Sequence, residues 1–185
     1  YNEMKGAFSS PDEVLEREIM NHLFPDTTYG CESGGDPKNI PDLTYENFLN
    51  FHRTYYHPSN SYIYLYGNMD MEEKLAFLDE HYLSHFDYLD VDSVIQEQKA
   101  FGACRDVTLE YPVAENEGEE DNTYLSYNMV VGNAADSQMA MAFEVLDYAL
   151  LSAPGAPLKQ ALLDVKAGKD VYGSYDDGIL QPYFT

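Results

Sequence analysis

Two pairs of histidines have spacings that could support chemistry. In "HYLSH", His81 and His85 lie four residues apart, a spacing that places two zinc ligands one turn apart on a helix. No glutamate lies between them to act as a general base, and Tyr82 and Leu83 are typical packing residues. We therefore interpret His81 and His85 as ordinary helix histidines.

The second pair, His52 and His57, lies in "FHRTYYH". His52 falls on the apolar face of the helix expected there, and His57 falls at its end, where the helix dipole favours a histidine. Packing and the dipole therefore explain both residues. Two other patterns are weaker: "SGGDP" (33–37) lacks the Lys-Ser/Thr of a phosphate loop, and the GxSxG elbow of a serine hydrolase does not occur.

One carboxylate, Glu3, stands in an expected helix one turn before the "SSPDE" break at 9–13. A glutamate in a helix is usually a surface residue. The position alone leaves two alternatives open: a solvent-exposed side chain, or one arm of a site whose other arms lie elsewhere.

The elements that would position these residues begin with a well-marked helix. Ser10, Pro11 and Glu13 form the pattern of an N-cap, a first-turn proline and a capping-box acid, and Pro25 should end the helix. Its apolar residues recur every four positions, at Leu15, Ile19 and Leu23. The sequence therefore predicts an amphipathic helix directly after the segment that holds Glu3.

A loop and two more helices are expected next. Residues 30–43 are rich in Gly, Asp and Pro and should form the loop. A helix capped by Thr44 should run to Pro58, and another should begin at Asp70. Between these helices, the β-branched and aromatic residues 61–67 predict a strand. The third helix should bury a stripe formed by Leu75, Leu78 and Tyr82.

The second half of the chain predicts strands and helices in separate blocks. The expected order is an aperiodic linker, a strand at 106–113, an acidic loop at 115–121, a strand at 123–131, a helix at about 136–151, a short helix at 158–164 and one or two strands in 170–185. The 136–151 helix carries a core stripe of Met139, Phe143, Leu146 and Leu150. Strands joined by hairpin-like loops, with segregated helices, predict an α+β fold with antiparallel sheets and helices packed on one face.

Composition excludes several classes of function. The net charge of −23 argues against nucleic acid as a partner and allows attraction of basic peptides or cations. No apolar run is long enough to cross a bilayer, so no membrane partner is expected. The two cysteines, Cys31 and Cys104, have no CxxC spacing, which favours the cytoplasm or another reducing compartment. The chain opens in an expected helix and closes in an expected strand, so we expect an internal fragment of a longer protein.

Three stretches resemble the pitrilysin/insulinase superfamily of zinc peptidases, and most closely its presequence-protease branch. They are "YNEMKGAFSSPD" (1–12), "YGCESGGDPKNIPDLTYENFLNFHRTYYHPSNSYIYLYGNMD" (29–70) and "GAPLKQALLDVKAGKDVYGSYDDGILQPYF" (155–184). The resemblance covers most of the chain in the right order. The block from Gly-Gly-Asp-Pro to His-Pro-Ser-Asn is its most specific part, and the acidic loop at 115–121 is not included.

The resemblance implies a specific role for Glu3. These peptidases use an inverted H-x-x-E-H motif, in which two histidines bind zinc and the glutamate is the general base. A third ligand, also a glutamate, comes from a downstream helix similar to "NEMKG", and Glu3 matches that position. Catalytic zinc typically takes three protein ligands and keeps a fourth position for water.

The sequence also departs from the family pattern. Neither the four histidines discussed above nor His22 stands in an H-x-x-E-H motif, so the general base and both histidine ligands are expected upstream of Tyr1. No catalytic residue is assigned in this chain. The chain alone is expected to be inactive and to lack a tight zinc site, because a single carboxylate cannot hold zinc.

By analogy with the family, the chain contains pieces of two similar metallopeptidase-type α+β domains. Residues 1–86 would be the C-terminal part of the zinc-bearing domain, 87–104 a linker, and 105–185 the N-terminal part of the next homologous domain. The parent would be a zinc metalloendopeptidase that degrades unstructured peptides through zinc-activated water, with basic peptides favoured by the acidic surface. The alternative is a non-catalytic structural or peptide-binding half of the same fold. Expected partners are the remaining segments of the parent chain, and self-association of the fragment through exposed strand edges.

Overall fold

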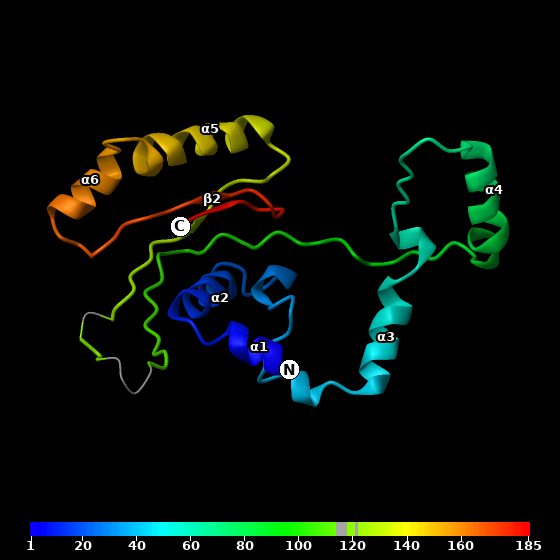
Figure 1. The fold of residues 1–185 in the computed structure, drawn as a ribbon, viewed down its shortest axis with the longest axis horizontal. Helices are drawn as coiled ribbons and strands as arrows, with labels where there is room; N and C mark the ends of the chain where they lie inside the picture. Colours follow the sequence, from blue (N-terminus) through cyan, green and yellow to red (C-terminus); the bar gives the residue numbers. More distant parts are fainter. Residues whose placement is uncertain (114–117, 121) are drawn as a thin grey trace. The chain divides into compact units, whose positions relative to one another are not determined.

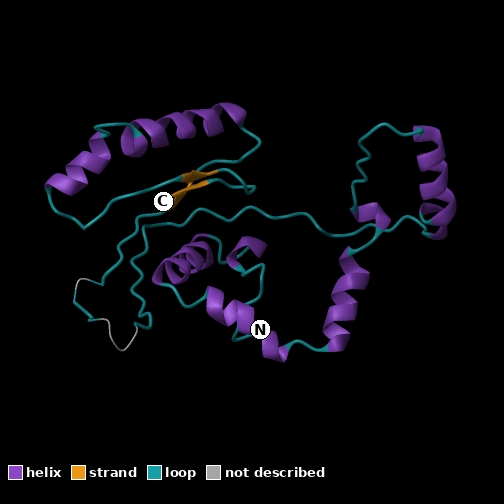
Figure 2. Ribbon diagram, viewed as in Figure 1, coloured by secondary structure: helices purple, strands orange, loops and turns teal. Residues whose placement is uncertain are grey.

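The computed structural model describes residues 1–113, 118–120 and 122–185. The chain divides into two compact units: a larger one formed by Tyr1–Pro37 and Ile95–Thr185, and a smaller one formed by Lys38–Val94 (Figures 1 and 2). Part of the predicted acidic loop, residues 115–117 and 121, lies outside the described residues. Every helix in the described part is too short or too polar to cross a bilayer.

The N-terminal helices of the larger unit form as predicted. Helix α1 spans Asn2–Ala7 and α2 spans Pro11–Leu23. The hydroxyl of Ser10 accepts a hydrogen bond from the backbone N–H of Glu13 at 3.2 Å, which confirms the predicted N-cap of α2. The helix ends two residues before Pro25, and a 3₁₀ turn, η1, follows at Thr28–Gly30.

A small antiparallel sheet forms the other part of this unit. Strand β3 (Tyr183–Phe184) lies in the middle, between β1 (Met129–Val130) and β2 (Tyr175–Asp176). The mixture of helices and antiparallel strands confirms the predicted α+β class. The strands are much shorter than expected: residues 106–113 and 123–128 have no ladder partner among the described residues, so only the end of the predicted 123–131 strand forms.

Helix α5 packs on this sheet. It spans Ser137–Asp147, and the ring of Phe143 stacks on Tyr175 of β2, with centroids 5.5 Å apart. A π-helical turn, η5 (Tyr148–Ser152), continues α5, and α6 (Pro157–Asp164) follows.

The π turn changes which leucine is buried. A π turn carries one more residue than an α turn, so it advances the helix face by one position. Leu151 is therefore buried, whereas the predicted Leu150 is only partly covered. Met139 and Leu146, also predicted to be core residues, are about two-fifths exposed. The prediction of a continuous buried stripe is therefore wrong.

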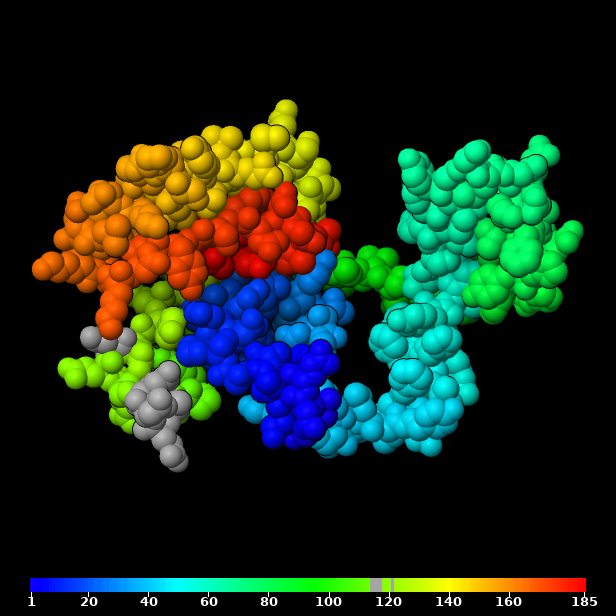
Figure 3. Space-filling view, in the orientation of Figure 1, coloured from blue at the N-terminus to red at the C-terminus, as the bar shows by residue number. Residues whose placement is uncertain are grey.

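The core of the larger unit lies where α2, η1 and β3 meet. Phe24 is fully buried, and its ring makes edge-to-face contacts with Tyr29 at 5.8 Å and Tyr183 at 6.2 Å. Figure 3 shows the C-terminal residues (red) lying against the N-terminal helices (blue). The aromatic cluster joins segments from both ends of the sequence.

The smaller unit consists of two helices and short turns. Helix α3 spans Tyr45–Tyr55 and α4 spans Met71–His81; η2 (Ile40–Asp42), η3 (Pro58–Asn60) and η4 (Leu83–His85) are 3₁₀ turns. The predicted caps are confirmed. Thr44 accepts from the N–H of Asn47, and Asp70 accepts from the N–H of Glu73, each at 3.1 Å.

The smaller unit has no buried core, contrary to prediction. None of residues 38–94 is fully buried, and Leu75 and Tyr82 of the predicted stripe are about half exposed. Residues 61–66 are extended but have no ladder partner among the described residues, so the predicted strand at 61–67 does not form. A strand is defined by hydrogen bonds to a neighbour, and this unit contains no second strand. The apolar faces of its two helices, α3 and α4, also provide too little surface to bury one another.

Candidate functional site

Glu3 lies in the first turn of α1, and its side chain is exposed. Within the described part of the chain, no side chain forms a hydrogen bond or ion pair with its carboxylate. The carboxylate oxygens are therefore accessible to an ion or a polar group that does not belong to the described residues.

Side-chain contacts on two sides hold α1 in place. Phe8, directly after the helix, lies against the guanidinium of Arg17 in α2, whose central carbon is 4.6 Å from the ring centroid. Met4 packs over Gly34, where an added Cβ would lie 2.8 Å from the methionine methyl group. These contacts fix the segment that carries Glu3 against α2 and the loop after it.

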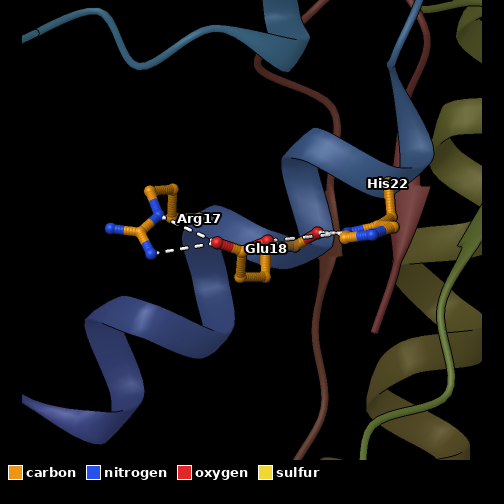
Figure 4. A network of polar contacts seen from close by, with 3 residues as sticks. All are labelled: Arg17, Glu18 and His22. Carbon is orange, nitrogen blue, oxygen red and sulfur yellow. Dashed lines mark hydrogen bonds and ion pairs between the residues drawn. The ribbon is translucent and has the colours of Figure 1, made fainter. Parts of the chain in front are cut away.

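A polar network on α2 orients Arg17 (Figure 4). The guanidinium donates to the Glu18 carboxylate from Nη2 at 2.9 Å and from Nε at 3.3 Å. One turn later, Nδ1 of His22 bonds to the carbonyl oxygen of Glu18 at 2.7 Å. A carbonyl oxygen can only accept, so Nδ1 carries the proton. The two hydrogen bonds to Glu18 hold the Arg17 guanidinium in place, and the ring of Phe8 packs against it.

An open groove of about 360 Å³ lies between α2 and the loop at 28–33, beside Phe8. Three carboxylates line it, from Glu13, Glu16 and Glu32, together with the guanidinium of Arg17. The groove next to α1 is therefore net negative, in keeping with the charge of the whole chain.

The described residues do not form a complete metal site. Within residues 1–113, 118–120 and 122–185, no three side chains of His, Cys, Asp or Glu lie together in a way that could hold a metal ion.

The histidine pairs have local structural roles. Helix α4 ends at His81, and His85 lies in the separate turn η4, so the two do not share one helix face as their spacing suggested. His52 stacks on Tyr56, with ring centroids 4.8 Å apart. His57 lies beyond the end of α3 and caps η3, where its Nδ1 accepts from the N–H of Ser59 at 3.1 Å. His57 thus lies directly after Tyr56, the C-cap of α3, and its stabilisation by the helix dipole stays a prediction.

Sequence reasoning missed two buried glutamines, Gln98 and Gln181, the exposed Asp26 that pairs with Gln98, and the partly buried phenol of Tyr183. The two glutamines carry no motif, and Gln98 lies in the aperiodic stretch interpreted as a linker. Only three-dimensional proximity reveals them.

The ionisation of Tyr183 should make the stability of the protein depend on pH in the alkaline range. Burial, and then the carboxylate of Asp176, to which the phenol donates at 3.2 Å, raises the pKa of Tyr183 from 10.0 to about 12. The fold therefore favours the neutral phenol. Its contribution to stability is complete below pH 10 and is lost as the pH rises towards about 12.

We expect the urea midpoint of the protein to fall between pH 10 and about 12, and Tyr183→Phe to flatten that fall while lowering stability at pH 7. The fully exposed Tyr62 supplies the control, Tyr62→Phe, which should keep the wild-type pH profile. Identical alkaline slopes for wild type and Tyr183→Phe would contradict the assignment.

Comparison with known proteins identifies one matching family and several relatives. Residues 42–185 match the family described as the peptidase M16 inactive domain. Protein HypA of Clostridium perfringens is 50% identical over 185 residues, which cover 100% of this chain and 19% of that protein.

Two presequence proteases are also similar. Presequence protease 1, chloroplastic/mitochondrial, of Arabidopsis thaliana is 39% identical over 188 residues, covering 100% of this chain and 17% of that protein. The mitochondrial presequence protease of Xenopus laevis is 35% identical over 171 residues, covering 92% of this chain and 17% of that protein. The chain thus spans less than a fifth of the length of these relatives. The chain therefore belongs to the peptidase M16 family, as a presequence-protease-like member whose residues 42–185 correspond to a domain described as inactive.

Proposed function

We propose that this chain is a segment of a zinc metalloendopeptidase that degrades unstructured peptides, and that Glu3 is one ligand of its metal. The observation that carries the proposal is the exposed carboxylate of Glu3, which has no partner within the described residues, on a helix anchored by Phe8 and Met4. Anionic oxygen is a suitable ligand for catalytic zinc, which when bound supplies a Lewis acid that activates water. This chain's contribution is to hold one ligand at a fixed place, and the other ligands and the general base would come from elsewhere in the protein.

The domain division is part of the same proposal. Residues 1–86 would complete the zinc-bearing domain, 87–104 would link the two domains, and 105–185 would begin a second, similar α+β domain. This division concerns a longer protein, whereas the two compact units, which divide after Pro37 and after Val94, concern contacts within this chain.

Peptides are the proposed substrates. The names of the Arabidopsis and Xenopus relatives describe proteases of presequences. The charge of −23 favours basic peptides, because opposite charge raises the rate of encounter. Nucleic acid would be repelled.

The remaining segments of the protein are the proposed partners of the smaller unit. Its exposed aromatic side chains, together with the extended residues 61–66, are typical of surfaces that pack against further structure. In isolation the same surfaces should promote self-association.

The proposed compartment is a reducing one, because Cys31 and Cys104 are both free and exposed. The Arabidopsis and Xenopus relatives have names that place them in chloroplasts or mitochondria rather than in the cytoplasm.

The second candidate function is that of a non-catalytic half of the same fold, which would have a structural or peptide-binding role. It is favoured by the match of residues 42–185 to a domain described as inactive. In that case the carboxylate of Glu3 would have no metal to bind.

Substitution of Glu3 separates the two candidates. In the full-length protein, Glu3→Gln should reduce zinc stoichiometry well below one and lower peptide cleavage by about 100-fold or more, since even residues that only orient a ligand cost 10- to 100-fold in affinity or activity. Glu46→Gln is the matched control, because Glu46 is also an exposed first-turn glutamate, in α3, and should change neither quantity. Unchanged zinc content and rate in Glu3→Gln would refute the ligand role. A wild-type protein without zinc or cleavage would favour the non-catalytic half.

A further inference from the structure

Two glutamine side chains are buried in the larger unit. Gln98 is 6% exposed and Gln181 is 9% exposed, although glutamine is usually a surface residue. Gln98 lies in the stretch that sequence reasoning interpreted as a linker. A buried amide must have hydrogen-bond partners, and both of these amides do.

The side chain of Gln181 pairs with the backbone of Gln98. The N–H of Gln98 donates to Oε1 of Gln181 at 2.5 Å, and Nε2 of Gln181 donates to the carbonyl oxygen of Gln98 at 3.2 Å. A primary amide has the donor and acceptor of a peptide group, so this two-point pairing imitates one rung of a β-ladder. It attaches residue 98 to the segment that leads into β3.

The side chain of Gln98 in turn pairs with Asp26. Its Oε1 accepts from the backbone N–H of Asp26 at 2.9 Å, and its Nε2 donates to Oδ2 of the Asp26 carboxylate at 2.7 Å. Asp26 lies three residues beyond the end of α2. One glutamine therefore bonds to α2's exit through its side chain and to the β3 segment through its backbone.

We infer that Asp26, Gln98 and Gln181 form an amide clasp that fixes α2 to the β3 segment and so positions the α1–α2 pair that carries Glu3. The positioning of Glu3 rests on the proposed function, whereas the clasp does not. Segment 95–98 runs between the N-terminal helices and the β2–β3 hairpin (Figure 1). Its hydrogen bonds to Asp26 and Gln181 connect these two parts of the larger unit.

Other contacts near the clasp also join the β3 segment to the residues that follow α2. The phenol oxygen of Tyr29 accepts from the N–H of Leu180 at 3.1 Å, and the ring of Tyr183 contacts Phe24. The segment before and within β3 is thus joined to the exit of α2 by aromatic packing on one side and by the clasp on the other.

The clasp requires an amide rather than a carboxylate at residue 98. Gln98→Glu replaces the Nε2 donor by an acceptor and places a second carboxylate beside Asp26. Adding Asp26→Asn restores the bond with reversed polarity, since the new amide donates to the new carboxylate and the backbone N–H of residue 26 still donates. Gln160→Glu is the matched control, because Gln160 donates to Asp164 at 2.7 Å on the exposed surface of α6.

Hydrogen exchange in the full-length protein tests the clasp. In Gln98→Glu, the amides of α2 and of residues 180, 181 and 183–185 should exchange at least tenfold faster, and Asp26→Asn with Gln98→Glu should recover most of the protection. Gln160→Glu should leave these amides unchanged. Unchanged protection in Gln98→Glu would overturn the clasp, and so would a double variant no better protected than Gln98→Glu.

Zinc retention against a chelator tests the coupling to Glu3 separately. Gln98→Glu should shorten the half-life of bound zinc, and the double variant should restore it. Faster exchange in α2 with an unchanged zinc half-life would overturn the positioning of Glu3. Failure of Glu3 itself as a ligand would be seen in Glu3→Gln and would leave the exchange results for the clasp intact.

Discussion

Phe24→Ala should lower the free energy of unfolding of this protein by about 3–5 kcal/mol, the usual cost of removing a fully buried phenylalanine. Phe24 has no exposed surface, and its ring is held edge-on by Tyr29 and Tyr183. The described core contains few other buried apolar residues, so nothing nearby can fill the cavity. Urea denaturation followed by tyrosine fluorescence would measure the loss, since the chain contains 17 tyrosines and no tryptophan.

Phe48→Ala is the control for this result. Phe48 is an aromatic side chain of α3 that is about two-thirds exposed, so its removal from the 185-residue chain should change the unfolding free energy by about 0.5 kcal/mol or less. Equal losses for the two variants would show that Phe24 is not the centre of a core.

Gly173→Ala should produce the second large loss, about 1–3 kcal/mol, typical of forcing extra atoms into a packed site. An added Cβ would overlap the carbonyl oxygen of Thr185 and lie 2.6 Å from Cδ1 of Leu151. The backbone cannot move aside without breaking two hydrogen bonds between Ser174 and Thr185, at 3.0 and 2.9 Å. The expected result is a lower urea midpoint together with faster exchange at the amides of Ser174 and Thr185.

Gly102→Ala is the matched control for Gly173. An added Cβ at residue 102 would meet no atom within 4 Å, and the residue does not have a positive φ. It should be neutral or slightly stabilising, because alanine restricts the unfolded chain. A neutral Gly173→Ala would mean that Ser174 and Thr185 do not pair in solution.

The features that the sequence predicted well are local ones. The caps at Ser10 and Asp70 depend on residues three positions apart, so their pattern is visible in the sequence. Burial could not be predicted in the same way. Leu75 has the right helical spacing but is exposed, since burial requires a partner surface that the smaller unit lacks.

Long-range pairing was the main limit on prediction. The bond between Asp26 and Gln98 joins residues 72 positions apart and leaves no periodic signal. The π turn after α5 moved the buried position to Leu151, because a single extra residue in a turn has no sequence signature of its own. For the candidate site, resemblance to a family, and not spacing, singled out Glu3.

Cys31 and Cys104 provide native attachment points for spectroscopic labels. Both thiols are exposed and neither forms a disulfide, and this chain contains no other cysteine to compete for a maleimide or nitroxide reagent. Cys31 lies five residues after Asp26 and Cys104 lies six residues after Gln98, so each of the two segments joined by the amide clasp would carry one label. Double electron–electron resonance spectroscopy would then measure the distribution of distances between the two nitroxides. No cysteine would have to be introduced into this chain.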